Sequence, residues 1–95
     1  MMNRYRIVTT ACYRKGYKRA AKRGLNLGKL DEVVYQLSHG EKLGPKYRDH
    51  ILVGSYKNYH ECHIQPDWLL IYKIQDDVLV LTLVDTGSHS DLFNN

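Results

Sequence analysis

The chain has 95 residues, of which 43% are hydrophobic and 25% are charged, so we expect one folded domain over residues 1–95. No apolar run is long enough to cross a bilayer, and the first residues do not form a signal-peptide core. The two cysteines, Cys12 and Cys62, do not make a disulfide framework. These features argue against a membrane-spanning or disulfide-rich secreted protein and predict a cytoplasmic one.

The net charge of +4 is distributed unevenly along the chain. Residues 1–50 contain twelve lysines and arginines and four acidic residues, whereas residues 51–95 contain two and six. Contacts from lysine and arginine to phosphate supply most sequence-independent affinity for nucleic acids. The basic half therefore predicts a polyanionic partner, although an acidic protein surface would satisfy the same charge.

The first half of the chain predicts a strand followed by a basic helix. Residues 5–9 have a strand pattern, and residues 10–23 have a helical pattern that Gly24 can end. One face of this helix is expected to be apolar, with Tyr13, Tyr17, Ala20 and Ala21. The opposite face is expected to be cationic and to point outward, with Arg14, Lys15, Lys18, Arg19 and Lys22.

A second helix is predicted over residues 27–38, and Gly40 can end it. Its apolar residues recur at the spacing of a core-facing stripe, at Leu30, Val33, Val34 and Leu37. The two helices are therefore predicted to form a hairpin with its cationic side outward.

The second half of the chain predicts strands. Residues 51–53, 57–64, 68–74 and 78–84 have strand patterns, with turns at Gly54, at residues 65–67 and at residues 76–77. Strands joined by short turns are antiparallel neighbours. The expected architecture is α+β, with an N-terminal strand and a basic helical hairpin packed on an antiparallel sheet.

Four of the five histidines lie in this second half or directly before it. Imidazoles suit acid–base chemistry because their ordinary pKa lies near neutrality. We interpret His39 and His60 as structural residues and Cys62 as buried. A zinc site made by His50, His63, His89 and Asp67 is an alternative on residue type, but the spacings match no established zinc pattern.

Two runs carry a resemblance to a known family: ECHIQPDWLLIY at residues 61–72 and TGSHSDLF at residues 86–93, preceded by KYRDH at residues 46–50 and GSYK at residues 54–57. In this order they resemble the YafQ branch of the RelE/ParE toxins, the toxin halves of bacterial type II toxin–antitoxin pairs. The fold of that family agrees with the architecture expected above.

The resemblance implies a ribosome-dependent endoribonuclease that cleaves messenger RNA without a metal or cofactor. The 2′-hydroxyl of the RNA attacks the adjacent phosphorus, so the enzyme supplies a base, an acid and positive charge. The family's functional residues fall on His50, His63, Asp67, Trp68, His89 and Phe93. Asp67 or His50 is the expected base and His89 the expected acid, with His63 positioning the substrate or stabilising charge.

Trp68 and Phe93 are expected to stack on RNA bases, as aromatic side chains do in single-stranded RNA recognition. Considered singly, Trp68 would be a core residue and Phe93 a C-terminal anchor, and Asp67 would form a turn. Family members commonly place an arginine at the position of Asp85. Lys46, Arg48 and Lys57 are the residues expected to supply positive charge in its place.

The resemblance also implies partners. A cognate antitoxin is expected to hold the toxin inactive, often as two toxins on an antitoxin dimer, and the basic helix face is expected to contact ribosomal RNA. The alternative function is a binding module of the same fold without catalysis, such as a gyrase-directed toxin.

Overall fold

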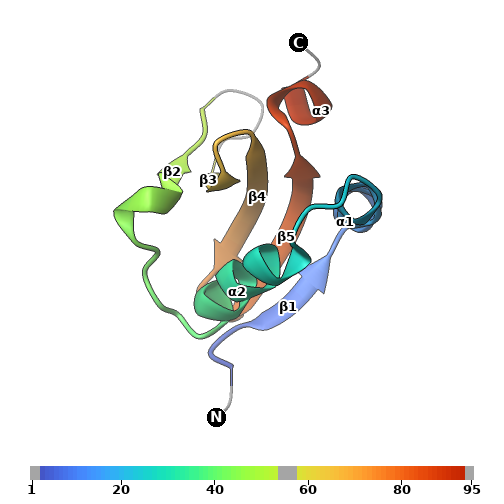
Figure 1. Ribbon diagram of the computed structural model, residues 1–95. Coiled ribbons are helices and arrows are strands. Elements are labelled where there is room, and N and C mark those ends of the chain that lie inside the picture. Colours follow the sequence, from blue (N-terminus) through green and yellow to red (C-terminus); the bar gives the residue numbers. More distant parts are fainter. Residues whose placement is uncertain (1–2, 54–57, 94–95) are drawn as a thin grey trace.

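The computed structural model describes residues 3–53 and 58–93 and contains a five-stranded sheet (Figure 1). The sheet has the order β1-β5-β4-β3-β2, with β1 parallel to β5 and the other neighbours antiparallel. Its strands are β1 (Arg6–Thr9), β2 (His50–Ile51), β3 (His60–Gln65), β4 (Trp68–Gln75) and β5 (Val80–Gly87). The helices are α1 (Ala11–Lys22), α2 (Leu27–Ser38) and α3 (His89–Phe93), and a 3-10 turn, η1, spans Pro45–Tyr47. The predicted α+β class is confirmed.

The first strand forms the one parallel pair among the described strands of the sheet. The antiparallel pairing of the C-terminal strands is confirmed, but β1 lies parallel to β5, with Ile7 opposite Leu81. No pairing direction was predicted for this N-terminal strand. A parallel pair joins segments that are distant in sequence, so turn lengths give no signal for it.

Several strand ends also differ from their predicted positions. The second strand is shorter and begins earlier, at His50–Ile51, and the third begins its pairing at His60. The last strand runs from Val80 to Gly87 because Leu79, in the preceding turn, has a left-handed backbone with φ of 54°. Gly54 and Lys57 lie outside the described residues.

Helix α1 begins where Thr10 caps it, because the Thr10 side chain accepts a hydrogen bond from the Tyr13 backbone N–H. The helix ends at Lys22 with Arg23 as its C-terminal cap, and Gly24 follows with a φ of 75°. Its buried face comprises Tyr13, Gly16 and Ala20. Ala21 is exposed, so its predicted place on the apolar face is wrong, and Gly16 takes part in the packing instead.

Helix α2 has the predicted bounds, with Asn26 as its N-terminal cap. The predicted apolar stripe is confirmed, since Leu30, Val33 and Leu37 are buried and Val34 packs against them. Gly40 follows the helix with a φ of 77°.

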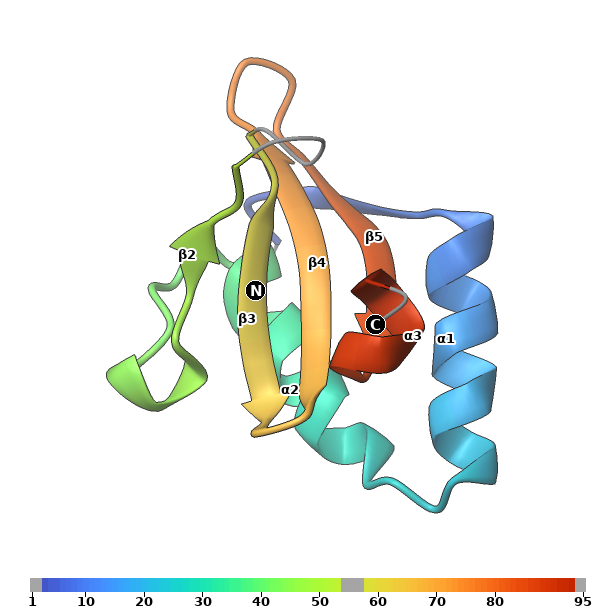
Figure 2. The same ribbon diagram turned by 90° about the horizontal axis from the view of Figure 1, so that it is seen from above.

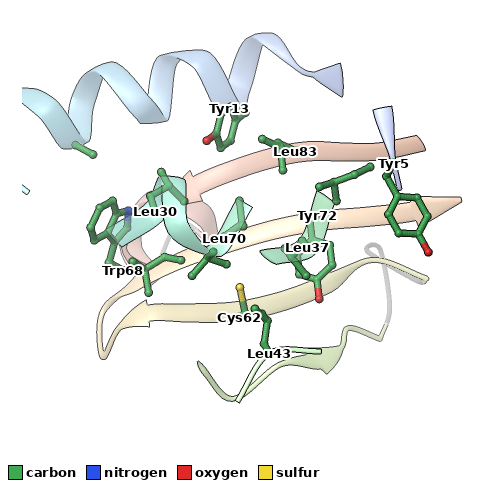
Figure 3. Close-up of a cluster of buried hydrophobic side chains, with 14 residues drawn as sticks. Tyr5, Tyr13, Leu30, Leu37, Leu43, Cys62, Trp68, Leu70, Tyr72 and Leu83 are labelled. Carbon is green, nitrogen blue, oxygen red and sulfur yellow. The ribbon is translucent and has the colours of Figure 1, made fainter. Parts of the chain in front are cut away.

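The core lies between the two longer helices and one face of the sheet (Figure 3). Leu30 and Leu37 of α2 lie over Leu70 and Cys62 of the strands, and Tyr13 of α1 lies near Leu83 (Figure 3). Burial raises the pKa of the Cys62 thiol, and both Cys62 and the exposed Cys12 are free cysteines, as expected. Within the described residues, no helix is long and apolar enough to span a membrane.

The chain ends in a short helix, α3, that the sequence analysis treated only as a tail. Ser88 and Asp91 bond reciprocally across its first turn, with Ser88 N donating to Asp91 Oδ2 at 2.9 Å and Asp91 N donating to Ser88 Oγ at 3.1 Å. Figure 2 shows α3 between the end of β5 and helix α1, in agreement with its ion pair to Arg23. The Ser-x-x-Asp spacing of Ser88 and Asp91 is typical of a helix N-terminus and could have predicted this helix.

Candidate acid–base site

The face of the sheet turned away from α1 and α2 carries a buried carboxylate between two imidazoles. Alternation along β3 places Cys62 and Ile64 in the core and points Glu61 and His63 to the other face. Strand pairing places His50 opposite Glu61. The Glu61 Oε1 atom lies 3.3 Å from His50 Nε2 and 3.6 Å from His63 Nε2, and Glu61 is only 6% exposed. One carboxylate therefore lies within ion-pair distance of both rings, whose Nδ1 atoms bond the carbonyl oxygens of Arg48 and Pro66.

A second histidine–carboxylate pair joins the β3–β4 turn to the start of α3. Pro66 and Asp67 form the predicted turn, and Asp67 Oδ1 accepts hydrogen bonds from the His89 backbone N–H at 3.0 Å and from Nδ1 at 2.7 Å. These two bonds, the backbone one first, lower the pKa of Asp67. Asp67 is therefore a carboxylate at neutral pH, and its bond to Nδ1 leaves His89 Nε2 available for proton transfer.

The two clusters adjoin each other. The rings of His63 and His89 lie 5.9 Å apart between centroids, and the ring of Phe93 lies 6.4 Å from that of His89. The structure thus brings together all four residues predicted to be catalytic: His50, His63, Asp67 and His89. Phe93 lies partly exposed beside them, where a stacking role is sterically open.

Glu61 is the residue of this cluster that the sequence analysis did not select. It stands two residues before His63, and this spacing places both side chains on one face of a strand. The strand pairing that brings His50 opposite Glu61 is a long-range contact, so the shared carboxylate appears only in the folded chain.

Trp68 does not belong to the open part of the site. It is 2% exposed, and its Nε1–H donates to Thr86 Oγ1 at 3.1 Å in the core. The predicted stacking of Trp68 on RNA bases is therefore wrong for this conformation, and its alternative interpretation as a core residue is confirmed. Strand alternation explains the difference, because Trp68, Leu70 and Tyr72 all point toward the helices.

Positive charge lies beside His63 in a cleft of about 530 Å³ between the start of α2 and the β3–β4 turn. Lys46 and Arg48 line this cleft together with His63, and the Lys46 ammonium lies 5.1 Å from the centre of the Tyr47 ring. Lys57, the third predicted cation, lies outside the described residues. Two of the predicted cations thus line the same cleft as His63.

Helix α3 is held by an ion-pair network that the sequence analysis did not predict. Asp91 Oδ2 lies 2.6 Å from Arg23 Nη1 and 3.5 Å from Arg19 Nε. The bond from Arg23, followed by those from Ser88, lowers the pKa of Asp91 well below its usual range. Because His89 and Phe93 lie on α3, this network also holds two of the predicted site residues in place.

Arg19 departs from the exposed basic face predicted for α1. Its guanidinium donates to the Thr86 carbonyl oxygen at 3.0 Å, so Arg19 connects α1 to the end of β5. Arg19 is therefore only partly exposed, whereas Arg14, Lys15, Lys18 and Lys22 are exposed as predicted. Asp85, nearby on β5, is partly buried, and burial raises the pKa of its carboxyl group.

The described residues do not form a metal site. No group of three or more His, Cys, Asp or Glu side chains among them is arranged to hold an ion. Glu61 contacts His50 and His63, while Asp67 contacts His89, so the four residues of the zinc alternative do not converge on one point. That alternative is not supported.

The fold and the site together define a class: a small α+β protein with paired imidazoles and carboxylates, set for proton transfer, on the sheet face away from its two longer helices. A family model described as the bacterial toxin of type II toxin–antitoxin systems, YafQ, matches residues 5–94. The chain therefore belongs to the YafQ family of toxins.

Individual relatives agree with this assignment. The mRNA interferase toxin YafQ of Escherichia coli strain K12 is 40% identical over 82 residues, covering 85% of this chain and 87% of the relative. The putative toxin YafQ of Haemophilus influenzae is 39% identical over 75 residues, covering 74% of each chain.

Solved structures are similar over almost the whole chain. The toxin in a crystal structure of the E. coli DinJ–YafQ toxin–antitoxin complex has a TM-score of 0.87 and 37% identity, covering 95% of this chain and 98% of that one. A metal-bound toxin from Helicobacter pylori has a TM-score of 0.88 and 43% identity, covering 94% of this chain and 99% of that one.

Proposed function

We propose that this chain is an endoribonuclease toxin that cleaves messenger RNA on the translating ribosome, with its own side chains as the base and the acid. The observation that carries the proposal is the contiguous set of two histidine–carboxylate clusters, Glu61 with His50 and His63, and Asp67 with His89. The curated relatives named mRNA interferases support the substrate class.

The reaction needs no group beyond the RNA and these side chains. A base removes the proton of the 2′-hydroxyl, the 2′-oxygen bonds to the adjacent phosphorus, and the bond from phosphorus to the 5′-oxygen breaks. An acid then gives a proton to that 5′-oxygen. The products are a 2′,3′-cyclic phosphate and a 5′-hydroxyl end, which conserves all atoms.

The contacts support the following assignment of roles. Asp67 is occupied by two hydrogen bonds from His89, and its lowered pKa makes it a weak base. We therefore assign Asp67 to orient His89 as the acid and His50, which is half exposed, as the base. His50 Nδ1 donates to the Arg48 carbonyl oxygen at 2.9 Å, so Nε2, 3.3 Å from Glu61 Oε1, is the nitrogen assigned to accept the proton. His63 is assigned to stabilise the negative charge that develops on the oxygens bound to phosphorus.

Positive charge for the phosphate is assigned to Lys46 and Arg48, which line the cleft beside His63. Donors fixed before the reaction stabilise developing charge without reorganisation, so cations that border the cleft are well placed for it. Lys57 remains a prediction for the same role. Phe93 is assigned to stack on a base of the message next to His89.

A cognate antitoxin is the proposed partner. The support is the similar E. coli toxin YafQ, which was crystallised in a toxin–antitoxin complex with DinJ. An assembly of two toxins on an antitoxin dimer remains the proposed stoichiometry.

The proposal is tested by inducible expression with growth followed and messenger 5′-ends mapped. The wild type is expected to arrest growth and to produce new cuts in translated messages, absent when the start codon of the message is removed. His50→Ala is expected to abolish both effects, whereas the control His39→Ala, at the end of α2, is expected to behave as the wild type. Arrest that persists in His50→Ala without cuts would instead indicate a binding mechanism.

The exposed cations of α1 give a separate prediction for ribosome binding. We expect the affinity for the ribosome to fall steeply as salt rises, because phosphate contacts release counterions. Replacing both Lys15 and Lys18 by serine is expected to lower the slope of log affinity against log salt by about 2, roughly 1 for each lost phosphate contact. Sedimentation with ribosomes across a salt series measures this slope. The matched control is Lys42→Ser, which lies in the connector after α2, and an unchanged slope in the double variant would contradict the model.

A further inference from the structure

The segment that carries His50 has little support from the strand on which it lies. β2 contains only His50 and Ile51, lies at the edge of the sheet, and Ile51 is 61% exposed. Arg48, two residues before His50, has a left-handed backbone with φ of 49°. Two ladder residues form a weak attachment. After them the Leu52 N–H donates to the Tyr59 carbonyl oxygen at 2.8 Å, and before them a side-chain contact anchors the chain.

That contact comes from the adjacent residue, Asp49. One carboxylate oxygen of Asp49 lies 2.8 Å from His60 Nδ1, and the other accepts a hydrogen bond from the Tyr72 hydroxyl. The rings of His60 and Tyr72 stack, with centroids 5.0 Å apart and an interplanar angle of 21°. Asp49 is thereby fastened to two neighbouring strands, β3 and β4.

The opposite directions of the Asp49 and His50 side chains connect the Asp49 contact to the candidate acid–base site. Neighbouring residues of an extended chain point to opposite faces, so Asp49 faces the core side while His50 faces Glu61 on the other. Tyr72 is only 2% exposed, and burial, followed by the bond to Asp49, raises the pKa of its hydroxyl. The hydroxyl therefore remains a hydrogen-bond donor at all physiological pH values.

We propose that Asp49 is a positioning residue, whose bonds to Tyr72 and His60 fix the backbone that presents His50 to the candidate site. This inference rests on the proposed function for its effect on rate, although the positioning itself is a property of the free protein. It also gives a role to His60, which the acid–base site does not use.

The test compares two tyrosine variants that remove the same kind of bond. Tyr72→Phe deletes the hydroxyl that bonds Asp49. The matched control is Tyr5→Phe, because Tyr5 is also buried and its hydroxyl donates to a carboxylate, Asp76 Oδ1, at 2.5 Å, in the β4–β5 turn. The two variants should lose similar stability, whereas only Tyr72→Phe releases the His50 segment.

The first readout is the NMR signal of the His50 ring in the free protein and its nuclear Overhauser contacts to Glu61. We expect Tyr72→Phe to shift or broaden this signal and to weaken those contacts, and Tyr5→Phe to leave both unchanged. The second readout is the single-turnover rate of RNA cleavage, expected to fall about tenfold in Tyr72→Phe, since a displaced catalytic group loses rate even when it is still present. Asp49→Ala should reproduce both effects.

Equal effects of the two tyrosine variants on the His50 ring would overturn the proposal. If the wild type cleaves no RNA, the proposed function fails, but the ring signals of the free protein still decide whether Asp49 positions His50. A loss of rate in Tyr72→Phe with an unchanged His50 ring would also overturn it.

Discussion

Replacing His89 by alanine is expected to lower the single-turnover rate of RNA cleavage by about 10²–10⁴-fold, the usual contribution of a positioned general acid. The 5′-oxygen leaves poorly without a proton, and His89 is the imidazole whose second nitrogen is free after Nδ1 bonds Asp67 at 2.7 Å. The measurement is the rate on programmed ribosomes at saturating enzyme, so that binding does not limit it.

A graded variant distinguishes the acid from its orienting partner. Asp67→Asn keeps an oxygen that can accept the His89 backbone N–H bond but removes the negative charge beside the ring. We expect a smaller loss than in His89→Ala, since the acid itself remains. His39→Ala is the control, because that ring bonds the Tyr35 carbonyl oxygen at the end of α2. Full activity in His89→Ala would reject the assigned role.

Replacing Gly16 by alanine is expected to destabilise the protein by about 3 kcal/mol, the upper part of the range for overpacking a core. A Cβ atom at Gly16 would lie 2.2 Å from the Thr86 carbonyl oxygen and 3.0 Å from Cγ2 of Thr86. Alanine is the better helix former by roughly 1 kcal/mol, so the clash and the helix propensity act in opposite directions. We expect the clash with the Thr86 carbonyl oxygen to outweigh the gain in helix propensity, so that the variant is less stable. The reason is that β5 cannot move away without disturbing the strands paired on both of its sides.

Thermal unfolding measures this effect. For a domain of this size about 3 kcal/mol corresponds to a fall in melting temperature of roughly 12–24 °C. The matched control is Gly44→Ala, since a Cβ atom there meets nothing within 4 Å and Gly44 has a φ of −66°. A melting temperature within a few degrees of the wild type in Gly16→Ala would show that α1 can move away from β5.

Much of the fold was predictable from local patterns. The stripe of Leu30, Val33 and Leu37 predicted α2 with its observed bounds, because helical periodicity reports which residues meet a core. The turn at Pro66 and Asp67 predicted the β3–β4 hairpin, since turn residues act through their own backbone preferences.

The candidate site was predictable only in part. The resemblance selected His50, His63, Asp67 and His89, and these side chains do lie together. It also selected Trp68, which lies in the core with its indole N–H bonded to Thr86, because a residue type at a motif position does not state which face of a strand it occupies.

The sequence by itself determined the local elements, the basic first half and the residue types available for acid–base chemistry. Only the tertiary structure decided that β1 runs parallel to β5, that Glu61 stands between two imidazoles, and that Arg19 turns inward to Thr86. The reason is physical. Periodicity and turn chemistry act over a few neighbouring residues, whereas these contacts join segments far apart in the chain and form only when the strands pair and the helices pack on the sheet.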